Sequence, residues 1–162
     1  MLKFEHLVQI NDPQLPALEP LSREQLWRGL VMRARFPTEF VLGLESCVIE
    51  SEREAGDDTV LTRKLDFGPF QVHDTVTLTP MDRVSVVAQA TDLWPRSEAT
   101  VHIEEPQPGA LFLRFVYELA LEDGSEDLAE PMQDLRKQAY VAADLDTVQR
   151  IRELTGGSGL LH

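Results

Sequence analysis

The order of the predicted elements constrains the fold of this chain more than any single motif does. Residues 2–10 alternate between apolar and polar side chains, which predicts a half-buried strand. Two helical segments come next, then a run of strands with short separators, and an amphipathic helix comes last. This order predicts an α+β fold in which a curved sheet wraps around a helix and leaves room for a cavity between the two.

The first helical segment begins at a capping box. Ser22 and Gln25 have the spacing at which each side chain caps the backbone N–H of the other, and Leu21 stands where a hydrophobic staple is expected. The helix must end before Pro37, because the residue that precedes a proline avoids the α conformation. Residues 38–42 are predicted to form one further turn, so two short helices follow the first strand.

Residues 44–121 carry alternating segments divided by turn residues. The predicted strands share this pattern and span 44–54, 59–67, 70–79, 83–91, 97–105 and 110–121. Because the connections are short, consecutive strands are expected to pair antiparallel, as a meander.

The last helix is predicted to begin near Asp127, with Glu130 as its partner in a second capping box. Apolar residues recur along it at helical spacing and form one stripe of Leu128, Met132, Leu135, Ala139 and Ala142. The stripe then steps by three through Leu145, Val148, Ile151 and Leu154, so it drifts round the helix, and a bend near residues 143–147 is expected. A chain of 162 residues suffices for one domain with a real core. We place that domain at residues 1–157, with a flexible tail at 158–162.

The composition narrows the class of partner. Hydrophobic residues make up 43% of the chain and charged residues 27%, an ordinary globular mix. A net charge of −13 repels phosphate backbones and anionic headgroups, so neither a nucleic-acid partner nor a stable membrane association is predicted. The first residues lack the regions of a signal peptide, no apolar run approaches the ~18 residues of a membrane span, and Cys47 is the only cysteine. These features predict a cytoplasmic protein. The oligomeric state stays open.

The turn at Gly68-Pro69 predicts a strand register with a charged pair in it. If these two residues form the tip of a hairpin, Arg63 lies opposite Asp74, on a face that is otherwise apolar. A charge on an inward face is costly unless it is paired. The pair therefore has two interpretations: a salt bridge that joins the strands, or a polar anchor in a cavity that holds a ligand carboxylate or carbonyl.

Two more polar side chains fall on apolar faces. His6 lies at the centre of the apolar face of the first strand. Tyr117 lies on the apolar face of the strand over 110–121. Each is either a core residue with a satisfied hydrogen bond or a cavity group that contacts a ligand. Trp27, beside Leu26 on the first helix, is either a core residue or part of the cavity wall.

The sequence offers little for metal or nucleophilic chemistry. A loop at 105–109 would pair Ile103 with Leu111 and Val101 with Leu113, which turns His102 and Glu104 outward, and His73 is out of phase with its apolar neighbours. No metal site and no cofactor are predicted. No glycine-rich phosphate loop or nucleophile elbow is present in the sequence, and Cys47 is expected to pack as a small apolar side chain.

These elements resemble the helix-grip fold of the START and Bet v 1-like superfamily, and within it the AtaL-like family. The segments that carry the resemblance are His6–Pro13, Leu21–Leu30 and Arg33–Pro37. The resemblance implies a seven-stranded antiparallel sheet folded around the last helix, with a hydrophobic cavity between them. Members of the superfamily bind lipids, sterols, polyketides or plant hormones, and some are polyketide cyclases or aromatases.

Three functions remain open from the sequence. The leading hypothesis is the binding of a small hydrophobic or amphipathic molecule, lipid-like or polyketide-like, in the cavity. The alternatives are an enzyme of the cyclase or dehydratase type that uses the same cavity, and an acidic module that docks onto a basic protein surface. The residues predicted to line the site are His6, Trp27, Arg63, Asp74, Phe115, Tyr117, Met132 and Leu135.

Overall fold

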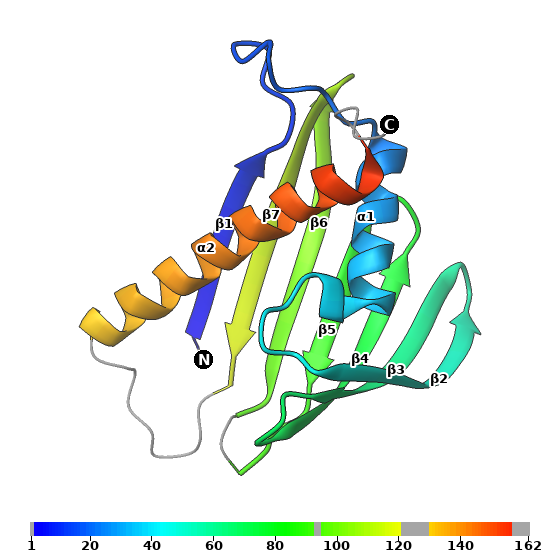
Figure 1. Ribbon diagram of the computed structural model, residues 1–162, viewed down its shortest axis with the longest axis vertical. Helices are drawn as coiled ribbons and strands as arrows, with labels where there is room; N and C mark the ends of the chain where they lie inside the picture. Colours follow the sequence, from blue (N-terminus) through cyan, green and yellow to red (C-terminus); the bar gives the residue numbers. More distant parts are fainter. Residues whose placement is uncertain (1, 93–94, 121–129, 157–162) are drawn as a thin grey trace.

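The computed structural model describes residues 2–92, 95–120 and 130–156 (Figure 1). Its strands are β1 (Leu2–Gln9), β2 (Ser46–Ala55), β3 (Asp58–Asp66), β4 (Gln71–Thr79), β5 (Arg83–Ala88), β6 (Ser97–Gln107) and β7 (Ala110–Leu119). Its helices are α1 (Arg23–Arg35), the 3-10 turn η1 (Pro37–Glu39) and α2 (Glu130–Thr155). The strands form one antiparallel sheet in the order β1-β7-β6-β5-β4-β3-β2. The predicted α+β helix-grip architecture and its seven strands are confirmed.

The helical segment after β1 forms largely as predicted. The Ser22 hydroxyl accepts the Gln25 backbone N–H at 3.0 Å, and the Gln25 side chain accepts the Ser22 backbone N–H at 2.8 Å. The helix ends at Arg35, before the proline that opens η1. Only one of the two expected helices is an α-helix, because the second segment closes as a single 3-10 turn.

The hairpin of β3 and β4 has the predicted register. Arg63 pairs with Asp74 across the two strands, flanked on the same face by the Leu65–Val72 and Leu61–Val76 pairs. The turn works because Gly68 adopts a φ of +94°, which side-chain-bearing residues rarely reach. Local turn chemistry and strand alternation thus set this register together.

The predicted pairing of β6 with β7 is wrong by two residues. Ile103 lies opposite Leu113, not Leu111, and Val101 lies opposite Phe115, not Leu113. The reason is a tighter turn at Pro108-Gly109, which pairs Gln107 with Ala110 and leaves an irregular stretch between Glu104 and Gln107. A slip of two residues keeps every side chain on its expected face, so the inward set is unchanged. β5 is also shorter than predicted and ends at Ala88.

Helix α2 runs diagonally across one face of the sheet, and α1 lies beside its C-terminal part (Figure 1). The two helices approach closely at Gly29 of α1, where an added Cβ would lie 2.4 Å from the Ile151 side chain. This contact closes a continuous core between the sheet and both helices.

The inward face of α2 differs from the predicted stripe. Leu135 and Leu145 are 61% and 51% exposed, and Ala139 and Ala142 are exposed as well. The buried side chains are Asp144, Thr147, Val148 and Ile151. The prediction is confirmed for Val148 and Ile151 and wrong for Leu135, Ala139, Ala142 and Leu145. It ranked positions by hydrophobicity alone, whereas a buried aspartate lies at the centre of the inward face.

Some expectations fall outside the described residues. They concern the start of the last helix at Asp127, the acidic residues in the segment 121–129 before that helix, and the tail at 158–162. Among the helices that are described, none is long and apolar enough to cross a membrane.

Candidate functional site

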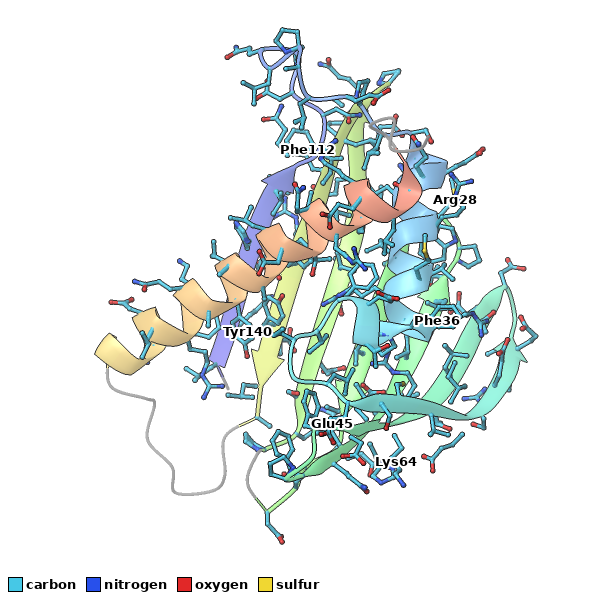
Figure 2. The ribbon with its side chains drawn as sticks, viewed as in Figure 1. Arg28, Phe36, Glu45, Lys64, Phe112 and Tyr140 are labelled. Carbon is cyan, nitrogen blue, oxygen red and sulfur yellow. The ribbon has the colours of Figure 1, made fainter. Side chains whose placement is uncertain are left out.

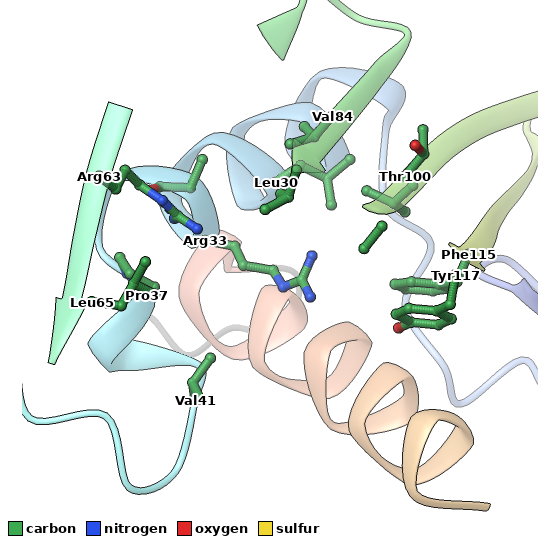
Figure 3. Close-up of a pocket in the computed structure, with 14 residues that line it drawn as sticks. Leu30, Arg33, Pro37, Val41, Arg63, Leu65, Val84, Thr100, Phe115 and Tyr117 are labelled. Carbon is green, nitrogen blue, oxygen red and sulfur yellow. The ribbon is translucent and has the colours of Figure 1, made fainter. Parts of the chain in front are cut away.

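A pocket opens between the sheet and α1, with a cavity volume of about 150 Å³ (Figure 3). Its walls are mostly apolar and come from α1, the segment around η1, and strands β3, β5, β6 and β7. The lining residues are Leu30, Arg33, Ala34, Pro37, Val41, Arg63, Leu65, Val84, Val86, Ala99, Thr100, Val101, Phe115 and Tyr117. The sequence predicted a cavity under α2, yet no described residue of α2 lines this one, because Asp144 and its buried neighbours on α2 pack inward themselves.

One end of the pocket carries the predicted charged pair. Arg63 donates two hydrogen bonds to the Asp74 carboxylate, from Nε at 2.8 Å and from a terminal nitrogen at 2.7 Å. Its other terminal nitrogen donates to the Ala34 carbonyl at 2.7 Å, so the pair also ties β3 to the end of α1. Both side chains are buried, at 6% and 5% exposure. Arg63 is therefore fully engaged within the protein.

A second polar cluster lies where β1, β7 and α2 meet. The Asp144 carboxylate, only 1% exposed, accepts a hydrogen bond from the Tyr117 hydroxyl and lies 3.1 Å from Nδ1 of His6. The Tyr117 ring stacks on the Tyr140 ring, with centroids 4.0 Å apart and planes 7° apart. Figure 2 labels Tyr140 on the sheet side of α2. The Tyr117 hydroxyl therefore has a carboxylate partner while its ring lines the pocket.

Arg33 lies between these two clusters. It leaves α1 one turn after Leu30, and its guanidinium extends toward the middle of the pocket (Figure 3). Within the part of the chain that the structure describes, its guanidinium has no hydrogen-bond or ion-pair partner. It is thus a cation in an apolar pocket with its N–H donors unused.

Burial shifts the pKa values of the groups around the pocket. Desolvation lowers the pKa of Arg33, although Tyr117 and Asp144 act on it in the opposite direction. Desolvation raises the pKa of Asp144 despite its hydrogen bonds with Tyr117 and His6. The pKa of Tyr117 is raised by burial and by the Asp144 carboxylate, so its hydroxyl stays a proton donor. Burial therefore makes the charged form of each group less favourable than it is in water.

The predicted site residues divide among several places. Arg63, Phe115 and Tyr117 line the pocket. Asp74 and His6 do not line it: Asp74 accepts hydrogen bonds from Arg63, and His6 lies against Asp144. Trp27 is partly buried and packs against the core. Leu135 points to solvent, and the side chain of Met132 lies outside the described set.

Sequence reasoning missed two functional groups, Arg33 and Asp144. Arg33 follows Leu26 by seven residues and Leu30 by three, the spacing of a shared helical face. Asp144 lies four residues after Tyr140 and four before Val148, so it too shares an inward face. Both signals were present, but a charged residue at an apolar position is usually assigned to the surface.

The other reactive residues considered, His73 and Cys47, do not line the pocket. His73 is exposed on β4, as predicted, and lies 3.3 Å from Glu50. Cys47 is half-buried, and desolvation raises the pKa of its thiol, which disfavours the reactive thiolate. No group of three or more potential metal ligands occurs among the described residues.

Comparison with solved structures supports the same architecture. The chain is similar to the di-domain ARO/CYC StfQ from the steffimycin biosynthetic pathway, with a TM-score of 0.63 and 9% identity over 92% of this chain. It spans about half of StfQ, 48% of that chain. It is also similar to the Zhui aromatase/cyclase from Streptomyces sp. R1128, with a TM-score of 0.57 and 14% identity over 98% of both chains.

A third similar structure is a START superfamily protein from Mycobacterium smegmatis, with a TM-score of 0.61 and 12% identity over 94% of this chain and 98% of that one. At these identities the likeness shows the fold alone. No curated protein matches the sequence. The family model for acetylaranotin biosynthesis cluster protein L matches residues 8–157. The chain therefore belongs to the AtaL family.

Proposed function

We propose that this protein binds a small hydrophobic or amphipathic molecule in the pocket between the sheet and α1. The observation that carries the proposal is the make-up of the pocket: an apolar wall interrupted by an unpaired guanidinium and an aromatic pair, Phe115 and Tyr117. Ligand sites typically combine an apolar lining with a few convergent polar groups. The volume of about 150 Å³ is near that of a cavity that takes a single aromatic ring, so a larger ligand would extend toward the mouth.

The test uses a side chain that fills the pocket. Ala99 lines the pocket from β6, and a leucine there would occupy space that a ligand needs. We expect the neutral fluorescent probe 1-aminoanthracene to bind the wild type and to bind Ala99→Leu at least about tenfold more weakly, a loss of about 1.4 kcal/mol. The matched control is Ala142→Leu, because Ala142 is exposed on α2. Equal binding by all three proteins would show that the probe occupies another place.

A second candidate function is an enzyme of the cyclase or dehydratase type, favoured by the Asp144–Tyr117–His6 cluster. Tyr117 keeps its proton and lines the pocket, and Asp144 accepts a hydrogen bond from its hydroxyl and lies 3.1 Å from Nδ1 of His6. Positioned groups of this kind can act as general acids and bases. The fold that the chain shares with aromatase/cyclases is compatible with such a role, although a fold does not establish a reaction.

The enzyme hypothesis predicts turnover that depends on Asp144. A β-hydroxyketone such as 4-hydroxy-4-phenylbutan-2-one loses water to form a conjugated enone, which can be followed by ultraviolet absorbance. We expect the wild type to accelerate this dehydration and Asp144→Asn to lose about a hundredfold in rate, the range of general acid–base catalysis. Cys47→Ser serves as the control. If the wild type and Asp144→Asn bind 1-aminoanthracene equally and neither accelerates the reaction, the protein is a binder rather than a dehydratase.

A further inference from the structure

Arg33 is a charged group that the fold itself does not neutralise by contact. The other arginine in the pocket, Arg63, donates its hydrogen bonds to the Asp74 carboxylate and to the Ala34 carbonyl. Among the described residues, no acceptor lies within hydrogen-bond distance of the Arg33 guanidinium. A guanidinium carries five N–H donors in a fixed planar fork, so the pocket presents several unused donors at its centre.

The groups around Arg33 do not supply the missing anion. Asp74 is held by two hydrogen bonds from Arg63. Asp144 acts on Arg33 only through space, while its two oxygens face Tyr117 and His6. Tyr117 is itself neutral at ordinary pH. The charges that face the pocket from α1, α2 and the sheet therefore leave the guanidinium without a contacting counter-charge.

Arg33 is half-buried, so its guanidinium keeps some contact with solvent, but an unpaired charge against an apolar wall is still costly to a folded protein. The neighbouring cation, Arg35, shows the ordinary arrangement at the same end of α1. It points outward and forms a bidentate pair with Glu52, with distances of 2.9 and 3.0 Å. Arg35, which points outward, thus has a carboxylate partner, whereas Arg33, which points into the pocket, has none among the described residues.

We propose that the ligand of this pocket is an apolar molecule with a carboxylate, and that the two carboxylate oxygens accept hydrogen bonds from Arg33. This inference rests on the proposed binding function and specifies its ligand class. The planar fork of arginine matches a carboxylate in bidentate geometry. The apolar body of the ligand would then lie toward Phe115 and Tyr117, on the side of the pocket opposite Arg33 (Figure 3).

The rest of the pocket favours a carboxylate over a phosphate. A phosphate group carries up to two charges and three acceptor oxygens, and each needs a donor when it leaves water. The described lining offers one free guanidinium and otherwise mostly aliphatic side chains. The net charge of −13 further opposes a dianion. A single delocalised negative charge on an apolar body fits both constraints.

The experiment compares two probes of the same shape, 2-naphthoate and 2-naphthamide, by fluorescence titration at neutral pH. We expect the wild type to bind the carboxylate more tightly than the amide. Arg33→Met should bind the carboxylate roughly tenfold to a hundredfold more weakly, as expected for loss of a hydrogen-bonded charge pair. It should bind the amide equally well or better. Arg33→Lys keeps the charge but not the planar fork, so its affinity for the carboxylate should lie between those of the wild type and Arg33→Met.

Arg35→Met is the matched control, because it removes the same charge from the same end of α1 but outside the pocket. It should leave both affinities unchanged. Urea unfolding of each variant checks the fold, and Arg33→Met should be no less stable than the wild type because it removes an uncompensated charge.

Three results would overturn the inference. Equal affinities for both probes in the wild type and in Arg33→Met would leave the binding function intact but refute the carboxylate anchor. If Arg33→Met and Arg35→Met lose the same amount of affinity for 2-naphthoate, the loss is due to net charge and not to a contact with Arg33. If neither probe binds the wild type and 1-aminoanthracene also fails, the binding function fails as well.

Discussion

At the scale of single residues, the interior of this protein holds more charge than its apolar strand faces suggest. Arg63 and Asp74 balance each other at one end of the pocket, and Asp144 shares its oxygens between Tyr117 and His6 at the other. The second arrangement has a consequence for pH. Because burial raises the pKa of Asp144, the folded protein holds this proton more tightly than the unfolded chain does.

The stability that this proton provides should therefore be complete below about pH 4, the ordinary value for aspartate, and should be lost as the pH rises through the higher folded-state value. Asp144→Asn keeps an acceptor for Tyr117 but cannot ionise. We expect the unfolding free energy of the wild type, minus that of Asp144→Asn, to fall as the pH rises from about 4. Urea titrations over a pH series measure this difference. A difference that grows with pH would mean that Arg33 and His6 stabilise the carboxylate.

At the scale of elements, the position of α2 depends on a close contact with α1. Gly29 lies against Ile151, and a Cβ at Gly29 would be 2.4 Å from Cγ2 and 2.8 Å from Cγ1 of that side chain. Isoleucine is stiff at χ1 and fully buried here, so it cannot swing away. The helices would have to separate, and because Leu30 and Ala34 of α1 line the pocket, its wall would move with them.

Gly29→Ala should consequently destabilise the protein. Overpacking costs about 1 to 3 kcal/mol, and the better helix propensity of alanine offsets about 1 kcal/mol of that cost. In the background of Ile151→Ala the two closest atoms are gone and only Cβ remains, at 3.0 Å, so there the same substitution should cost much less. A double-mutant cycle by urea unfolding measures the difference between the two backgrounds. If Gly29→Ala costs the same in both backgrounds, the helix contact is not what requires glycine.

At the scale of the whole molecule, the pocket between the sheet and α1 is off the axis of α2. The sheet curves around α2, yet the pocket is bounded by α1 and the segment around η1 (Figures 1 and 3). The inward side of α2 is taken up by Asp144, Thr147 and their apolar neighbours. This pocket therefore lies where α1 and the middle of the sheet face each other.

Much of the architecture could be predicted from the sequence, because it depends on neighbouring residues. Alternation and short turns predict the strands and their antiparallel order. The Gly68-Pro69 turn predicts the Arg63–Asp74 register, and Ser22 with Gln25 predicts the start of α1. The β6–β7 register was wrong by two residues, because two turns of different length around Pro108-Gly109 satisfy the same alternation.

By itself, then, the sequence determined the order of strands and helices and the face on which each strand side chain lies. Only the tertiary structure decided which side chains from elements far apart in the sequence meet. His6 and Asp144 are 138 residues apart, and their contact depends on the rotation of α2 about its own axis. That rotation is fixed by packing against α1 and the sheet, and not by any local pattern. The same packing turns Arg33 inward while Arg35 reaches the surface, so the pocket and its unpaired charge belong to the assembled fold.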